Sequence, residues 1–385
     1  MKENEIRKCP AAELCGGCQL QGIPYEEQLK IKQEKVERLL GSYGKVEPIH
    51  GMRFPYFYRN KVQISFGRDH KGRILMGNYV TSSHVIVPVK SCQLAANCAN
   101  EIFQTIEKLL KSFRLSVFDE NSMEGFLRHV MVRSSHDEES VMVVLVTGSP
   151  VFPKKHDFIE ALLKAHPKIT TIVQNINSRR TSMILGERNI ILFGKGYIED
   201  ELCGSVFRLS PHSFYQTNHK QTEYLYTKAI SLAGLKKTDT VIDAYCGIGT
   251  IGLSMAEHVR EVLGVEINRT AVKDAVKNAR INNRDNITFI CDDAGKYMQK
   301  LAYDKKKIDV VVMDPPRSGS DEKFLSSLVK LGPERVVYIS CNPVTQKRDL
   351  KYLTAKGYKV MKIQPVDMFP HTEHCELIAL LERNI

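Results

Sequence analysis

The sequence of 385 residues predicts an α/β protein whose C-terminal half is a Rossmann-like, doubly wound and mostly parallel sheet. Three observations indicate this class. From Thr240 onward, apolar strand segments alternate with helical segments. The first of these strands leads into a glycine-rich turn, and acidic residues follow several of the later strands. Because such sheets bind their ligands at the carboxyl ends of the strands, we expect a binding site there.

The stretch TVIDAYCGIGTIGLSMAE at residues 240–257 is the element around which we expect the chain to be organised. Its apolar strand ends at Asp243, and Gly247, Gly249 and Gly252 then lead into a helix. Glycines leave room for a ligand close to the backbone, and a helix N-terminus offers free N–H groups. The turn alone fits a dinucleotide site, an S-adenosylmethionine site or close packing of a helix on a strand.

The composition is that of an ordinary globular protein, with 43% hydrophobic and 26% charged residues. The start MKENEIRKCP lacks the apolar core of a signal peptide, and no segment has the roughly eighteen apolar residues that a membrane helix needs. We therefore expect a cytoplasmic protein with no membrane partner, and a monomer. In a reducing compartment the ten cysteines are better interpreted as thiols, metal ligands or nucleophiles than as disulfides.

A net charge of +11 favours a polyanionic partner, and much of this charge lies in one window. Residues 51–100 contain seven lysines and arginines but a single acid, Asp69, and six phenylalanines and tyrosines are interleaved with the cations. Lysines and arginines can bind phosphates, and aromatic rings can stack on bases. The two together are typical of a surface that binds single-stranded nucleic acid. The alternative is a strand-rich region with its rings in the core and its charges in water.

Three cysteines near the N-terminus, Cys9, Cys15 and Cys18, form a C-x5-C-x2-C cluster. Thiols this close together, with two glycines between the last two, usually hold a metal in a reducing compartment. We expect the fourth ligand to be Cys92, with Cys98 as its competitor. Zinc and an iron–sulfur cluster both accept four thiolates, so the spacing does not identify the metal.

The first half of the chain is expected to be an α+β domain at residues 1–205. Residues 24–40 have the pattern of an amphipathic helix, with Leu29, Val36, Leu39 and Leu40 inward and a charged face in water. A second helix is expected at 96–113. Alternating apolar residues predict strands at 61–66, 73–80, 84–89, 129–135, 140–148, 169–177 and 188–194.

The second domain is expected at residues 206–385 and begins with a helix in 212–234. Acids end its first four strands: Asp243, Glu266, Asp293 and Asp314. Glu266 follows Gly247 by 19 residues, where a carboxylate can bind ribose hydroxyls, and Asp293 could reach an adenine, although either acid could instead cap a helix. Strands are expected at 240–245, 261–268, 287–293, 308–316, 335–343 and 376–383, with helices at 251–258, 270–282, 322–330 and 345–356.

The motif DPPRSG at residues 314–319 is not expected in a dinucleotide enzyme. Asp-Pro-Pro forms a rigid loop with few donors beside the reacting end of a cofactor. Enzymes that methylate amino groups generally place an aromatic residue after the prolines, where Arg317 stands here. RNA cytosine-C5 methylases carry their nucleophilic cysteine inside this motif, whereas here a cysteine ends the next strand, Cys341 in YISCNP.

Methylation of a pyrimidine carbon gives Cys341 a role. C5 of uracil becomes nucleophilic only after a thiolate adds at C6, so this reaction needs a cysteine next to the sulfonium. The alternative to a catalytic role is that Cys341 is an unreactive cysteine of the hydrophobic core. The C5 proton must then leave to a base, for which Glu376 in HTEHCELIALL is the candidate and the nearby His371, Glu373 and His374 are its competitors.

Taken together, SFYQTN, DAYCGIGTIGL, VEIN, DPPRSG, SCNP and FPHTEHCEL, preceded by the cysteine cluster, resemble the RNA 5-methyluridine methyltransferases that act on 23S rRNA and on tRNA. The resemblance runs in matching order from Cys9 to the C-terminus. It implies an S-adenosylmethionine-dependent domain preceded by a domain with a [4Fe-4S] cluster on Cys9, Cys15, Cys18 and Cys92.

The resemblance also implies roles for single residues. Cys341 is the nucleophile and Glu376 the base. Cofactor contacts are expected from the turn and the strand ends: Gln216, Tyr245, Gly247, Thr250, Glu266, Asp293 and Asp314. RNA contacts are expected from Arg59, Asn60, Lys61, Phe214 and Arg317.

We expect the substrate to be 23S rRNA, and two features of the sequence bear on this expectation. Many rRNA-directed members carry an N-terminal TRAM barrel before the cluster, and because the first cluster cysteine here is Cys9 we expect no such barrel. The tRNA T-loop enzymes share the chemistry but usually lack the four cysteines. The sequence is also compatible with a non-catalytic RNA-binding iron–sulfur protein and, from the glycines alone, with a NAD-dependent oxidoreductase.

Overall fold

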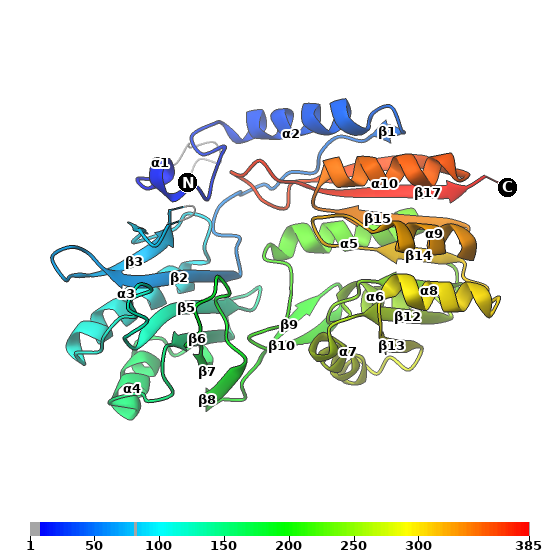
Figure 1. Cartoon of the computed structure of the whole chain (residues 1–385). Coiled ribbons are helices and arrows are strands. Elements are labelled where there is room, and N and C mark those ends of the chain that lie inside the picture. Colours follow the sequence, from blue (N-terminus) through cyan, green and yellow to red (C-terminus); the bar gives the residue numbers. More distant parts are fainter. Residues whose placement is uncertain (1–7, 81–82, 385) are drawn as a thin grey trace.

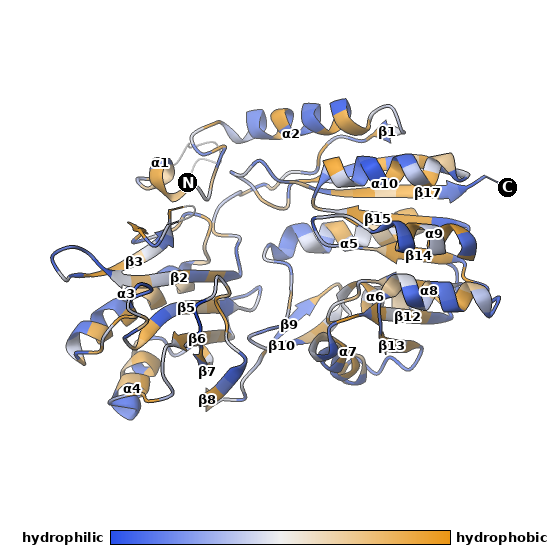
Figure 2. Cartoon of the chain, in the orientation of Figure 1, coloured by the Kyte–Doolittle hydropathy of each residue, from blue (hydrophilic) through white to orange (hydrophobic). Residues whose placement is uncertain are grey.

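The computed structural model describes residues 8–80 and 83–384, which form two large β-sheets connected by a two-stranded ribbon. The sheet of the N-terminal half and the sheet of the C-terminal half lie side by side (Figure 1). Hydrophobic colour follows strands such as β15 and β17, while α2 and α10 carry both hydrophilic and hydrophobic residues (Figure 2). This is the pattern of helices that cover the faces of a buried sheet.

The N-terminal sheet has seven strands in the order β4-β3-β2-β5-β6-β7-β8, and all of them were expected. Every neighbouring pair is antiparallel except β6 and β7, which are parallel and connected through α4. Two helices pack on its apolar face, α3 (Asn97–Ser112) and α4 (Lys155–Ala165). The strands are β2 (Lys61–Arg68), β3 (Ile74–Tyr79), β4 (Ile86–Pro88), β5 (Leu127–Ser134), β6 (Val141–Thr147), β7 (Ile169–Ile176) and β8 (Arg188–Gly194).

A short ribbon, β9 (Ile198–Leu202) and β10 (Ser205–Leu209), connects the two sheets. The sequence did not predict these strands, because the alternating segment IEDEL is mostly polar. The chain then enters α5 (His219–Ala233), where the Asn218 side chain accepts a hydrogen bond from the Gln221 N–H and caps the helix. The ribbon spans the expected domain boundary at 205 and 206, and that boundary stays a prediction.

The C-terminal sheet has eight strands in the order β1-β16-β17-β15-β14-β11-β12-β13. Strands β11 to β15 pair in parallel, with helices between them, while β17 is antiparallel to both of its neighbours. This arrangement confirms the predicted doubly wound, mostly parallel α/β sheet. The strands are β11 (Thr240–Ala244), β12 (Glu261–Glu266), β13 (Ile287–Cys291), β14 (Val310–Met313), β15 (Arg335–Ser340), β16 (Tyr358–Val366) and β17 (Glu376–Arg383).

Five helices accompany the strands of this sheet: α6 (Thr250–Ala256), α7 (Arg269–Ile281), α8 (Ala294–Tyr303), α9 (Glu322–Leu331) and α10 (Pro343–Ala355). Asp293 caps α8, because its Oδ1 accepts from the Lys296 N–H at 2.8 Å. The interpretation of one strand-end acid as a helix cap is thus confirmed for Asp293. No helix in the described part of the chain is both long and apolar enough to cross a membrane.

An N-terminal segment packs on the C-terminal sheet instead of on its sequence neighbours. Helix α2 (Tyr25–Leu40) places Val36 and Leu40 in the core of that sheet, and β1 (Lys45–Val46) pairs in parallel with β16. Helix α2 therefore lies next to α10 (Figure 1). The expectation that its whole charged face is in water is wrong for Lys32, which continues the buried stripe one turn before Val36 and is only 1% exposed.

A buried ion pair connects α2 to the segment that precedes β17. The Lys32 Nζ lies 2.6 Å from Asp367 Oδ1 and also donates to the Phe369 carbonyl. The Tyr25 hydroxyl donates to the other Asp367 oxygen at 2.8 Å. The Gln28 side chain accepts from the His371 N–H at 2.8 Å. One face of α2 thus fixes residues 367–371, which lead directly to Glu376.

We expect Lys32→Met to lower the free energy of unfolding by about 3–5 kcal/mol, because the substitution leaves the Asp367 carboxylate buried without its partner. The double variant Lys32→Met/Asp367→Leu should recover much of this loss, since it removes both charges. Urea denaturation followed by circular dichroism measures both. Lys30→Met, on the exposed face of the same helix, is the matched control. Equal stability of the Lys32 and Lys30 variants would contradict this role.

Candidate active site

The register of β15 and β17 places the two expected catalytic residues opposite each other. Ser340 is paired with Leu377 in this antiparallel ladder, so the next residues at the same end are Cys341 and Glu376. Cys341 is half-buried and is followed at once by Asn342, the N-cap of α10. Glu376 is 3% exposed. The nucleophile and the base predicted from the motifs therefore lie at one edge of the sheet.

Acidic residues dominate the surroundings of the Cys341 thiol. Burial raises its pKa to about 11, and the charges of Glu376 and Asp314 act in the same direction, while Arg317 opposes them. Burial and the neighbouring Asp314 also raise the pKa of Glu376 well above its usual value. Asp314 follows β14, the strand beside β15, and burial raises its pKa too. The resting site thus holds a protonated thiol between two carboxyl groups.

The glycine-rich turn lies one strand further along the same edge. Tyr245, directly after β11, has a φ of 64°, and its hydroxyl donates to Ser320. Gly247 has a φ of 56°, and a Cβ built there would meet no atom within 4 Å. The Glu266 carboxylate accepts from the Gly247 N–H at 3.2 Å. This turn leaves open space above its backbone and a carboxylate beside it.

A buried carboxylate beneath the turn holds its shape. Asp243 is fully buried, and its Oδ2 accepts from the Gly252 N–H at 2.7 Å. Burial raises its pKa to about 8. A Cβ at Gly252 would lie 2.8 Å from the same oxygen, so the position requires glycine. Thr250, the first residue of α6, faces inward, and its hydroxyl lies 3.1 Å from that of Tyr226.

The segment SFYQTN, residues 213–218, runs between the two sheets, and its side chains differ in how far they are exposed. Phe214 is 69% exposed, so its ring is free to stack on another flat group. Gln216 is 8% exposed, and its carbonyl accepts from the Asn60 side chain. Asn60 itself is 7% exposed, and its backbone N–H donates to the Thr217 carbonyl. In this structure Asn60 positions the segment and does not face solvent.

Two basic residues line a groove that leads toward the catalytic edge. Arg59 and Lys61 are half-buried and line a cavity of about 390 Å³ together with Phe369 and His374. Arg317 lies 3.4 Å from His374, measured between its Nη2 and the ring Nδ1. The groove thus connects the expected RNA-binding residues of β2 with the DPPRSG loop.

The four cluster cysteines converge in space although Cys92 is far from the others in sequence. Burial raises the pKa of Cys18 to about 12, and the neighbouring thiols of Cys92, Cys15 and Cys9 raise it further, while Arg59 lowers it. Cys15 ends the short helix α1 (Ala12–Cys15) and accepts from the Asn78 side chain. The competitor Cys98 lies elsewhere: its N–H donates to Glu138.

The competing bases are less well placed than Glu376. His371 is buried against α2, and burial lowers its pKa to about 4. Burial also lowers the pKa of His374, and Arg317 acts in the same direction. Glu373 is exposed. The sequence could not show which of these four residues is best placed as the base, since all four lie within six positions of one another.

Comparisons with known proteins indicate the same family as these motifs. The profile of the tRNA (uracil-5-)-methyltransferase family matches residues 174–384. An uncharacterized RNA methyltransferase of Staphylococcus aureus is 42% identical over 98% of this chain and 84% of its own length. One of Clostridium tetani is also 42% identical, over 97% and 82%.

A solved structure extends the comparison to the whole fold. It is the tRNA (uracil-54, C5)-methyltransferase of Pyrococcus abyssi in complex with S-adenosyl-L-homocysteine. It is 29% identical, with a TM-score of 0.78 over 98% of this chain and 87% of its own.

Removing one of the two carboxyl groups should make Cys341 more reactive. In Asp314→Asn a raising charge is lost, so the pKa of the thiol falls from about 11 and alkylation by iodoacetamide begins at lower pH. Peptide mass spectrometry of Cys341 alkylation, followed from neutral pH to above the thiol pKa of about 11, measures this shift. The exposed Cys291 is the internal control and should label equally in both proteins. An unchanged pH profile for Cys341 would exclude the proposed electrostatic coupling.

Proposed function

Because the chain belongs to the tRNA (uracil-5-)-methyltransferase family, we propose that it transfers a methyl group from S-adenosylmethionine to C5 of a uridine in RNA. The observation that carries the proposal is the juxtaposition of Cys341 and Glu376 at the carboxyl edge of the sheet, beside the glycine-rich turn. A thiol and a carboxyl group opposite each other are what a covalent uracil methylation requires.

In the proposed reaction the Cys341 thiol loses its proton to solvent and its sulfur forms a bond to C6 of the uracil. The electrons of the C5–C6 double bond make C5 nucleophilic, and C5 takes up the methyl group as the bond between that group and the sulfonium sulfur breaks and leaves a neutral thioether. The Glu376 carboxylate accepts the C5 proton, and the C6–S bond breaks as the double bond returns. The raised pKa of Glu376 suits this step, because a carboxylate of higher pKa is a stronger base.

The cofactor site is assigned to the turn and the strand ends. The open space above Gly247 and the carboxylate of Glu266 fit a nucleoside with ribose hydroxyls. Tyr245, Asp293 and Asp314 line the same edge, with Gln216 and Thr250 as further contacts. When bound, S-adenosylmethionine supplies an electrophilic methyl group on a cationic sulfonium. The carboxyl groups of Asp314 and Glu376 favour a cation at that position.

For the RNA we assign Phe214, Arg59, Lys61 and Arg317 to the bound strand. An exposed ring can stack on a base, and the arginines and the lysine of the groove can contact phosphates. Burial lowers the pKa of Lys61 to about 8, so a bound phosphate would also stabilise its charged form. Asn60 contributes by holding the SFYQTN segment.

We assign a [4Fe-4S] cluster to Cys9, Cys15, Cys18 and Cys92. Cys18 lies near enough to the other three thiols for their charges to raise its pKa, and four thiolates are the ligands that such a cluster takes. Methyl transfer needs no electron, so its role would be structural. Iron and sulfide analysis of anaerobically purified protein tests this assignment.

Two substrates are compatible with this chemistry. We favour 23S rRNA, because the tRNA T-loop enzymes usually lack the four cysteines. The T-loop uridine of tRNA is the second candidate, since the Pyrococcus abyssi protein with the same fold acts on tRNA.

The mechanism predicts different outcomes for the two catalytic positions. Cys341→Ala should lower methyl transfer to an RNA substrate by at least about 10⁴-fold, because the nucleophile is gone. Glu376→Gln should lower turnover by about 10²- to 10⁴-fold and accumulate a covalent protein–RNA adduct. Labelled cofactor measures methyl transfer, and denaturing electrophoresis detects the covalent protein–RNA adduct. Transfer by the alanine variant at the wild-type rate would exclude the Cys341 mechanism.

Transcripts of 23S rRNA fragments and of tRNA, offered separately, identify the substrate. We expect label in the rRNA and none in the tRNA, and the reverse result would establish the second candidate. Arg59→Gln should raise the KM for the methylated RNA several-fold. Arg68→Gln is the matched control, because Arg68 is exposed at the far end of β2, the strand that follows Arg59.

A further inference from the structure

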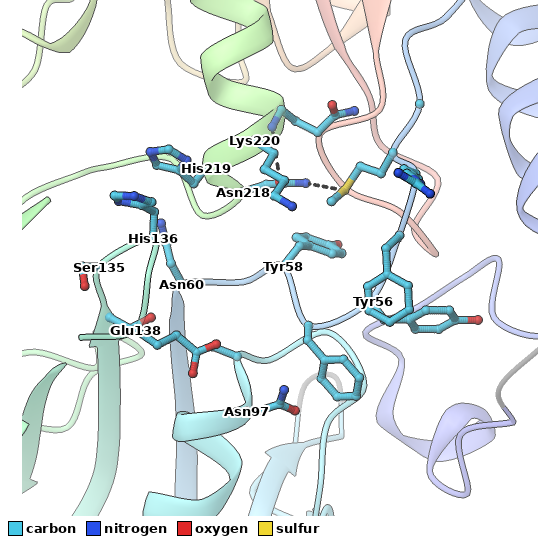
Figure 3. Close-up of a pocket in the computed structure, with 18 of the residues that line it drawn as sticks. Tyr56, Tyr58, Asn60, Asn97, Ser135, His136, Glu138, Asn218, His219 and Lys220 are labelled. Atoms are coloured by element: carbon cyan, nitrogen blue, oxygen red, sulfur yellow. Dashed lines mark hydrogen bonds between the residues drawn. The ribbon is translucent and has the colours of Figure 1, made fainter. Parts of the chain in front are cut away.

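Three potential metal ligands meet outside the catalytic edge, where the N-terminal sheet, the ribbon and α5 come together. His136 lies in the loop after β5, Asp200 on β9, and His219 is the first residue of α5. One ring nitrogen of each histidine and one carboxylate oxygen all lie within 4.8 Å of one another. Figure 3 shows His136 and His219 next to each other at the margin of a cavity of about 680 Å³.

The carboxylate of this group is buried and faces several donors. Asp200 is 3% exposed, and its Oδ1 lies 2.8 Å from His136 Nδ1 and accepts from the His136 backbone N–H. Its Oδ2 makes no hydrogen bond of ordinary geometry, but the buried Tyr215 hydroxyl interacts with the Asp200 carboxylate and can donate to it. A buried carboxylate favours a cation beside it, and a hydrogen bond from Tyr215 is the competing arrangement.

His219 has one ring nitrogen available for a metal. Its Nε2 lies 2.7 Å from the Glu201 carbonyl oxygen, which can only accept, so Nε2 donates there and Nδ1 is left for a ligand. A ligating histidine almost always donates its other N–H in this way, often to a backbone carbonyl. The rings of His136 and His219 stack with centroids 4.6 Å apart and planes 19° apart, so one ring must turn before both can point a nitrogen at the same ion.

Charged side chains of both signs surround the three ligands. Asp137 and Glu201 are the sequence neighbours of His136 and Asp200, and Glu138 lines the same cavity. The buried Arg133, Lys220 at the cavity and the positive end of α5 carry the opposite charge.

We propose that His136, Asp200 and His219 bind one divalent transition-metal ion of the zinc type. Two imidazoles and a carboxylate are a donor set for such ions, and the half-open cavity leaves room for water in the remaining positions. The ion would connect three segments that are far apart in sequence. It would thereby fix the start of α5, directly after the segment that carries Phe214 and Gln216.

Cobalt(II) is the probe, because its spectrum separates this site from the thiols. Nitrogen and oxygen ligands give weak visible bands, whereas thiolate ligands add intense near-ultraviolet charge-transfer bands. Titration of the full chain with Co²⁺ should reveal one ion with the visible bands alone. His136→Asn and His219→Asn, made separately, should each weaken this binding more than tenfold, because even the loss of an outer partner of a ligand costs about 10- to 100-fold.

His70→Asn, an exposed histidine in the turn between β2 and β3, is the matched control and should bind as the wild type does. Zinc should also raise the melting temperature of the wild type but of neither variant at positions 136 and 219. Absence of the visible bands in the wild type, or a Co²⁺ affinity of both histidine variants equal to that of the wild type, would overturn the proposal and leave the histidine–aspartate pair as an ordinary ion pair.

Discussion

The antiparallel ladder between β15 and β17 is the constraint on which the active site depends. It sets Ser340 against Leu377 and therefore Cys341 against Glu376. A slip by one residue would turn every side chain of β17 to the other face of the sheet and carry Glu376 away from the thiol. Buried apolar side chains on both faces, such as Ile378 and Leu381, oppose such a slip. Helix α2 adds to this through Lys32, which anchors the segment that leads into β17.

The same edge concentrates buried carboxyl groups. Burial raises the pKa values of Asp243, Asp314 and Glu376, and two of these groups raise that of the Cys341 thiol. Such surroundings favour a cation and disfavour an unpaired thiolate. The positive charge of Arg317 lowers the pKa of the Cys341 thiol, and a further cation at this edge would act in the same direction.

Local patterns in the sequence were sufficient for most of the fold. Alternating apolar residues predicted all seven strands of the N-terminal sheet, and the glycine-rich turn with its strand-end acids indicated the ligand edge. Other elements were missed. These are the polar ribbon strand β9, but also β10, β16, α4 and α8, whose apolar patterns are as clear as those of elements that were predicted. The burial of Lys32 was missed because its partner, Asp367, lies more than 300 residues away. For the same reason no local pattern could have brought together His136, Asp200 and His219.

The pairing of β1 with β16 has a consequence for how the protein is made. Lys45 and Lys362 are partners in this ladder, so residues near the start of the chain find their place only when the end has been synthesised. Contacts of such large sequence separation form slowly. Until then Val36 and Leu40 have no core to enter, and the nascent chain exposes an amphipathic helix to chaperones and proteases. A ribosome that stops early therefore releases a product whose large sheet lacks β16 and β17 and in which β1 has no strand to pair with.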